Sequence, residues 1–132
     1  MSKTFTIKAI QVAPEAAEKV REFKFKFIDY TNSMGVYYVA NGFVSFCLNR
    51  MLATFNQPED LVFETGECEA RLCDLETFRE KGELFLNILK NNIDTALFEH
   101  VEDVFTRTID TLEELTAEAR LAREEAAKDE QA

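Results

Sequence analysis

Residues 20–50 constrain the fold more than any other part of the chain, because charged and aromatic side chains alternate through them. A β-strand over residues 22–29 would place three phenylalanines on one face and two lysines on the other, since successive side chains of a strand point to opposite faces. These side chains are Phe23, Phe25 and Phe27, and Lys24 and Lys26. The pattern predicts a strand with one apolar and one basic face.

A second run, over residues 36–48, is rich in aromatic and β-branched residues and is interrupted by Asn41-Gly42. This dipeptide is typical of the two-residue turn that joins the strands of a hairpin. The run therefore predicts two further antiparallel strands on either side of the turn.

Both segments also allow a helical interpretation. Val20, Phe23 and Phe27 have the spacing of one helix face, and a helix capped at Asn41 would continue to Phe55. The preference of aromatic and β-branched residues for a pleated surface favours strands in both cases, after a short helix that ends at about Val20.

Two more strand signals lie outside this region. Residues 4–8 alternate polar and apolar, which is the period of a half-buried strand. Residues 61–72 predict another hairpin, with its turn at Thr65-Gly66. Residues 56–60 separate the two halves of the chain, and they are too few for a flexible interdomain linker.

The C-terminal half carries helix signals. Thr77 and Glu80 have the spacing of a capping box and open a helix in which Gly82 is a weak point, and Asn91-Asn92 predicts the turn that ends it. From Asp94 onward, apolar residues recur at spacings of three and four over about five turns. They are Leu97, Val101, Val104, Leu112 and Leu115, with Thr108 between them.

The sequence therefore predicts an α+β fold, with an antiparallel β-sheet in the N-terminal half followed by two C-terminal helices and a short acidic tail. Residues 1–123 are expected to form a single domain. Residues 124–132 are polar and acidic, and they are expected to be a mobile C-terminal tail.

The three cysteines, Cys47, Cys68 and Cys73, make an odd number without a CxxC pair. Such usage fits buried thiols in a reducing compartment better than a disulfide framework. The first residues are too polar for a signal peptide, and no apolar run approaches the length of a membrane span. We therefore expect a cytoplasmic protein that does not enter a membrane.

The net charge of −10 is unevenly distributed. Residues 1–56 carry a net charge of +3 and ten of the fifteen aromatic residues, whereas the remaining residues carry −13. A basic surface with exposed rings can bind single-stranded DNA, because cations follow the phosphates while the bases stack on the rings. The predicted nucleic-acid-binding residues are Lys8, Lys24, Lys26, Tyr30, Tyr37 and Arg50.

A surface with so small a positive charge would bind usefully if several copies presented it together. The apolar row of the last helix supplies a candidate surface for a homo-oligomer, a dimer or a tetramer. The predicted oligomerisation residues are Leu97, Val101, Val104, Leu112 and Leu115. Packing of the same row inside one protomer is the equally weighted alternative.

Catalytic chemistry is not indicated. The one histidine, His100, has no second histidine or cysteine at ligand spacing, so no metal or other cofactor is predicted. The four scattered glycines form no phosphate-binding loop, and no nucleophile motif is present. We expect a protein that is not an enzyme.

The organisation of the chain resembles that of small phage single-stranded-DNA-binding proteins, in particular the Drc-type transcription cofactors of podoviruses with a virion RNA polymerase. The resemblance lies in KFKF (residues 24–27), VYYVANGFVSF (residues 36–46) and EEAAKDEQA (residues 124–132). It implies sequence-tolerant binding of single-stranded DNA in the host cytoplasm, a homo-oligomer and support of viral transcription or replication through an RNA polymerase. The Pro-Phe pair that closes many bacterial single-strand-binding proteins is absent.

A second hypothesis is that the protein does not bind nucleic acid. In this alternative the chain is an acidic protein–protein interaction module, such as a phage inhibitor or an assembly chaperone. Its carboxylates contact a basic partner protein, and the alternation of lysine and phenylalanine is only structural.

Overall fold

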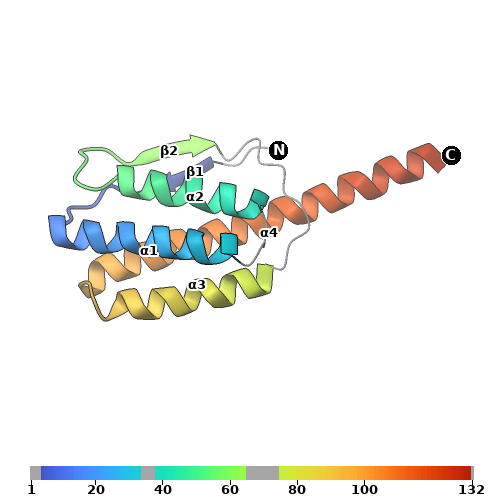
Figure 1. Ribbon diagram of the computed structural model, residues 1–132. Helices are drawn as coiled ribbons and strands as arrows, with labels where there is room; N and C mark the ends of the chain where they lie inside the picture. Colours follow the sequence, from blue (N-terminus) through green and yellow to red (C-terminus); the bar gives the residue numbers. More distant parts are fainter. Residues whose placement is uncertain (1–3, 34–37, 65–74, 132) are drawn as a thin grey trace.

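The computed structural model describes residues 4–33, 38–64 and 75–131, which form four helices and a small sheet (Figure 1). The elements are β1 (Thr4–Ile7), α1 (Pro14–Ser33), α2 (Tyr38–Ala53), β2 (Leu61–Glu64), α3 (Leu75–Lys90) and α4 (Thr95–Gln131). The predicted α+β fold with an N-terminal antiparallel sheet is wrong. The described chain is mostly helical, and its two strands come from segments far apart in the sequence.

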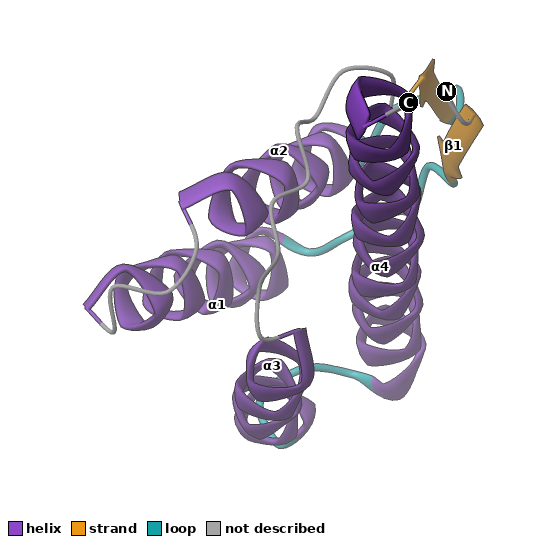
Figure 2. Ribbon diagram, turned by 90° about the vertical axis from the view of Figure 1, so that its right-hand side faces the viewer, coloured by secondary structure: helices purple, strands orange, loops and turns teal. Residues whose placement is uncertain are grey.

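The helices form a bundle in which each helix packs against two others. Both α1 and α4 pack against α2 and α3, so that α1 and α4 lie diagonally opposite each other (Figure 2). Packed neighbours run antiparallel, as the colours of Figure 1 show. This arrangement buries one face of every helix against two partners, as in other four-helix bundles.

The alternation of lysine and phenylalanine belongs to helix α1, and the predicted strand over residues 22–29 is wrong. Phe23 and Phe27 are buried with 4% and 0% exposure, whereas Phe25 is 55% exposed. Residues two apart in a helix differ in direction by about 200°, so alternate side chains cannot share a face. The spacing of Val20, Phe23 and Phe27 was the decisive signal, because burial against two helices outweighs the strand preference of phenylalanine.

The predicted hairpin around Asn41-Gly42 is also wrong, because this dipeptide lies within α2. Burial again explains the outcome. Apolar residues recur along α2 at helical spacing and fill the space between α1 and α4. These buried residues are Phe43, Val44, Cys47, Leu48 and Met51.

The small sheet pairs a strand that precedes α1 with a strand that follows α2. The strand predicted over residues 4–8 is confirmed as β1, and it pairs antiparallel with β2 in a register that places Phe5 opposite Phe63. The first strand of the predicted hairpin over residues 61–72 forms as β2, which pairs with β1, and the predicted second strand over residues 68–72 lies outside the described residues. Residues 65–74, including the turn at Thr65-Gly66, lie outside the described residues.

The two predicted C-terminal helices are confirmed as α3 and α4, and a turn at Asn91-Asn92 separates them. Asp94 caps α4, because its Oδ1 accepts a hydrogen bond of 2.9 Å from the backbone N–H of Leu97. α4 continues to Gln131, and the expected domain boundary at residue 123 falls inside it. Independent motion of residues 124–132 stays a prediction.

Gly82 has a packing role that the sequence did not indicate. A Cβ atom at Gly82 would lie 2.0 Å from Cζ and 2.4 Å from Cε1 of Phe105, so the missing side chain lets the Phe105 ring lie against the backbone of α3. The same ring contacts Phe23 and Phe27 edge-on, with centroid separations of 6.3 and 5.4 Å. Phe105 thus joins α1, α3 and α4.

The connections that flank the sheet are held together by Asn56. Its Oδ1 accepts a hydrogen bond of 2.8 Å from the backbone N–H of Val12, and its Nδ2 donates one of 3.0 Å to the carbonyl of Val12. Asn56 has a φ of 61°, a left-handed conformation that asparagine adopts more readily than most residues. The backbone N–H of Asn56 also donates to the carbonyl of Ile10.

Replacing Gly82 with alanine should destabilise the bundle. The gain in helix propensity is about 1 kcal/mol, but displacing the buried Phe105 ring should cost about 3 kcal/mol. We expect Gly82→Ala to lower the free energy of unfolding by about 2 kcal/mol in urea titrations. The loss should shrink in a Phe105→Leu background. A Gly82→Ala protein as stable as the wild type would contradict the close approach of α3 and α4.

Two substitutions at Asn56 should separate its hydrogen bonds from its backbone conformation. Asn56→Gly keeps the left-handed conformation accessible and loses both side-chain bonds, so it should cost about 1–2 kcal/mol. Asn56→Ala should cost about 1 kcal/mol more, because alanine resists a positive φ. Urea unfolding measures both values, and equal stability of the two variants would argue against strain at this position.

Candidate interaction surfaces

An acidic groove of about 460 Å³ lies between α3 and α4. Four carboxylate side chains line it, and three apolar side chains from the bundle core form its base. The carboxylates are those of Glu83, Glu99, Glu102 and Asp103, and the apolar residues are Leu86, Phe105 and Ile109. We name this feature the acidic groove.

Arg79 is the one cationic side chain among the residues that line the acidic groove, and it is already engaged. Its Nη2 lies 2.7 Å from Oδ1 of Asp110 and 3.2 Å from Oε2 of Glu113. The hydrogen bond to Asp110 raises the pKa of Arg79 above its ordinary value, although burial acts in the opposite direction. Arg79 therefore holds α3 to α4 rather than neutralising the groove.

Two of the groove carboxylates remain without a described counter-charge. Asp103 forms an ion pair of 3.6 Å with Arg107, and Glu83 lies near enough to Arg79 to interact with its charge. Glu99 and Glu102 form no ion pair with a residue that the structure describes, and both are exposed. Negative charge beside an apolar base suits a cationic ligand that also carries apolar groups.

The predicted nucleic-acid-binding residues do not form one surface. Lys24 lies on the α2 side of α1, where its Nζ donates a hydrogen bond of 2.5 Å to Oδ1 of Asn49. Arg50 follows Asn49 on α2, with its guanidinium 4.8 Å from the centre of the Phe46 ring. Burial, followed by the charge of Arg21, lowers the pKa of Lys24. Lys24 thus contacts Asn49, whereas Arg50 lies over Phe46, whose ring packs edge-on against Phe63 of β2.

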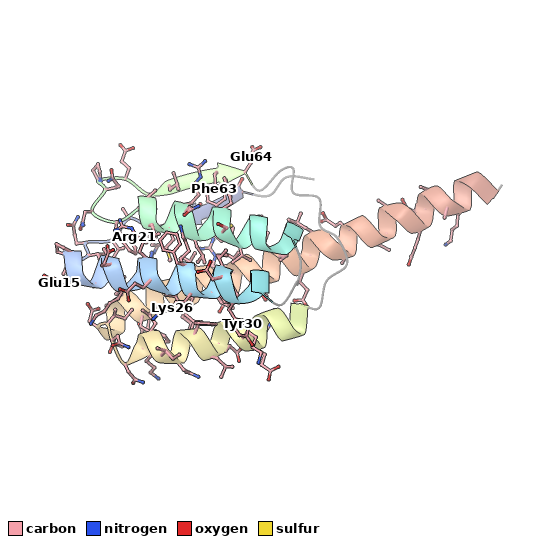
Figure 3. The ribbon with its side chains drawn as sticks, viewed as in Figure 1. Glu15, Arg21, Lys26, Tyr30, Phe63 and Glu64 are labelled. Carbon is pink, nitrogen blue, oxygen red and sulfur yellow. The ribbon has the colours of Figure 1, made fainter. Side chains whose placement is uncertain are left out.

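Lys26 and Tyr30 lie on the other side of α1, facing α3 (Figure 3). The Tyr30 ring contacts Phe85 edge-on at 5.6 Å, and Nζ of Lys81 lies 5.9 Å from the Tyr30 ring centre. The predicted common face of Lys24 and Lys26 is therefore wrong, because they lie two residues apart in a helix rather than in a strand.

Two predicted nucleic-acid-binding residues, Lys8 and Tyr37, remain. Lys8 is exposed in the segment between β1 and α1, and Tyr37 lies outside the described residues. The five predicted oligomerisation residues are buried within the protomer, so the alternative of packing inside the bundle holds. Their exposures are 3% for Leu97, 0% for Val101, 1% for Val104, 1% for Leu112 and 9% for Leu115.

His100 lies on α4 with its Nε2 buried and without a hydrogen-bond partner among the described residues. Burial lowers the pKa of His100 below the ordinary 6.5, although the charge of Asp103 acts in the opposite direction. No group of three or more metal-ligating side chains occurs within residues 4–33, 38–64 and 75–131. Cys47 is buried and forms no disulfide, and Cys68 and Cys73 lie outside the described part.

The acidic groove was not predicted, although the sequence contains a periodic pattern of acids that indicates one of its walls. Glu99, Glu102 and Asp103 recur at spacings of three and four, which places them on one face of a helix beside the apolar row. The position of Glu83 across from them follows only from the packing of α3 on α4. Helical periodicity of acids can therefore identify one wall of such a groove.

Comparisons of the chain with protein-family models, with curated proteins and with solved structures found no match. The resemblance to phage single-stranded-DNA-binding proteins therefore stays a prediction. Among the described residues, none of the helices combines the length and the hydropathy that crossing a bilayer requires.

The lowered pKa of His100 should make the bundle sensitive to acid. Below pH 6.5 the unfolded chain binds a proton at His100 more readily than the folded chain, so protonation favours unfolding as the pH falls. In His100→Leu this contribution is absent. Urea unfolding at pH 7 and pH 5 should therefore show a smaller loss of stability for the variant than for the wild type. Parallel losses would contradict the effect of burial on His100.

Proposed function

We propose that this protein is a non-enzymatic interaction module that binds a basic, amphipathic segment of a partner protein in the acidic groove. The observation that carries the proposal is the combination of uncompensated Glu99 and Glu102 with the apolar base of the groove. Lysine or arginine side chains of the partner would contact the carboxylates, while its apolar side chains lie against the base of the groove.

The charge distribution over the elements supports a basic partner. The four acids of α1, which are Glu15, Glu18, Glu22 and Asp29, equal in number its four lysines and arginines. The charges of α1 therefore cancel over the helix as a whole. The acids of α4 exceed its lysines and arginines by eleven to four, and an excess of negative charge speeds encounter with a cationic partner.

A second candidate is single-stranded DNA binding at the junction of α1 and α2. The observation that favours it is Phe25, which is 55% exposed with Nζ of Lys24 only 4.4 Å from its ring centre. Arg50 and the 39% exposed ring of Phe46 form a second cation–ring pair, on α2. Bases stack on such rings in proteins that bind single strands. A role in viral transcription would follow only from this candidate.

We place either activity in the cytoplasm. The support is the buried thiol of Cys47, which is typical of proteins from reducing compartments.

Fluorescence anisotropy tests the two candidates in one assay. The probes are a labelled amphipathic peptide of leucine and lysine at helical spacing, its glutamate analogue and a labelled single-stranded oligonucleotide. We expect the lysine peptide to bind, the other two probes to fail, and Glu99→Lys/Glu102→Lys to weaken peptide binding by roughly tenfold or more.

Glu15→Lys/Glu59→Lys is the matched control, because it changes the net charge equally outside the groove. It should alter peptide affinity by no more than about twofold at moderate salt. Equal weakening by both double variants would reduce the effect to net charge and overturn the proposed site. Binding of the oligonucleotide, lost in Lys24→Glu/Arg50→Glu, would instead establish the second candidate.

A further inference from the structure

The C-terminal part of α4 extends beyond the bundle. Leu115 is the last described apolar side chain of α4 that is buried, and Leu121 is 59% exposed. Figure 1 shows the end of α4 projecting away from the other helices. Sixteen residues separate Leu115 from Gln131, which corresponds to about 24 Å of helix. A helix of this length is marginal in water unless it packs against something.

The projecting segment has a defined chemistry around Leu121. Glu124 and Glu125 follow Leu121 at spacings of three and four, so all three side chains lie on one side of the helix. Both glutamates are exposed. The segment therefore presents one large apolar side chain next to two negative charges.

A groove of about 200 Å³ between α1 and α3 has the complementary chemistry. Ile88 lines it and is 62% exposed, so its side chain is available to a second apolar group. Lys19 and Lys26 from α1 also line this groove, against the single acid Glu22. Lys19 is oriented by a hydrogen bond of 2.8 Å from its Nζ to the carbonyl of Asn92. We name this feature the basic groove.

The basic groove lies beyond the reach of the protomer's own C-terminal segment. Asn92, which lines the groove, belongs to the turn immediately before α4. Leu121 lies 26 residues after the first residue of α4, which is about 39 Å along a continuous helix. A contact between Leu121 and Ile88 therefore requires two molecules.

We propose that the projecting end of α4 docks in the basic groove of a second copy of this chain. Leu121 of one protomer packs on Ile88 of the other, and Glu124 and Glu125 lie beside Lys19 and Lys26. Because each copy carries both the segment and the groove, two copies that dock reciprocally about a two-fold axis would form a symmetric dimer. This interface is separate from the acidic groove, and it uses none of the buried residues Leu97–Leu115 through which the sequence predicted oligomerisation.

Sedimentation equilibrium of the full chain at low salt tests the proposal. We expect the wild type to self-associate, and Leu121→Glu and Ile88→Glu each to raise the dissociation constant by roughly tenfold or more. Val62→Glu is the matched control, because Val62 is equally exposed at 60% but lies on β2. This control should associate as the wild type does. Circular dichroism verifies that all three variants keep the helical fold.

A charge exchange makes the test specific. Lys26→Glu and Glu125→Lys should each weaken association, and the double variant Lys26→Glu/Glu125→Lys should recover it, because positions 26 and 125 then again carry opposite charges. A monomeric wild type, or association that survives both Leu121→Glu and Ile88→Glu, would overturn the proposal. Neither result affects peptide binding at Glu99 and Glu102, so the proposed function is tested independently.

Discussion

The packing of the Phe105 ring against the backbone at Gly82 is the contact on which the rest of the bundle depends. It brings α3 and α4 close together, and the same ring contacts both Phe23 and Phe27 edge-on. Aromatic rings in edge-on contact contribute more than their buried area alone. The positions of both grooves follow from this centre, because each groove borders α3 and one of its two neighbours.

The burial of these phenylalanines determines which aromatic side chains are left exposed on the surface. Phe23, Phe27 and Phe105 are buried in the core, so these three rings are not available to stack on the bases of a nucleic acid. The helix also divides the lysines of α1 between two sides, with Lys24 toward α2 and Lys26 toward α3. The result is a molecule with a weakly basic groove on one flank of α3 and an acidic groove on the other.

Sequence reasoning succeeded where local signals agreed with tertiary burial. The polar–apolar alternation of β1, the apolar row of α4 and the turn at Asn91-Asn92 were predicted from the residues themselves. It failed over residues 20–50, where β-propensity and Asn41-Gly42 favoured strands. Burial of α1 and α2 between two partners each overrode these preferences, and such burial depends on residues remote in sequence. The grooves were unpredictable for the same reason, since each is made by two helices.

The pairing of β1 with β2 has a consequence for how the chain acquires its structure. Ile7 pairs with Leu61, so the 53 residues between them must be synthesised after β1 before its partner strand begins. Local contacts form sooner than distant ones, because closing a long loop costs more chain entropy. Helices α1 and α2 therefore precede the sheet during synthesis, and the N-terminal strand closes over a helical pair that is already present.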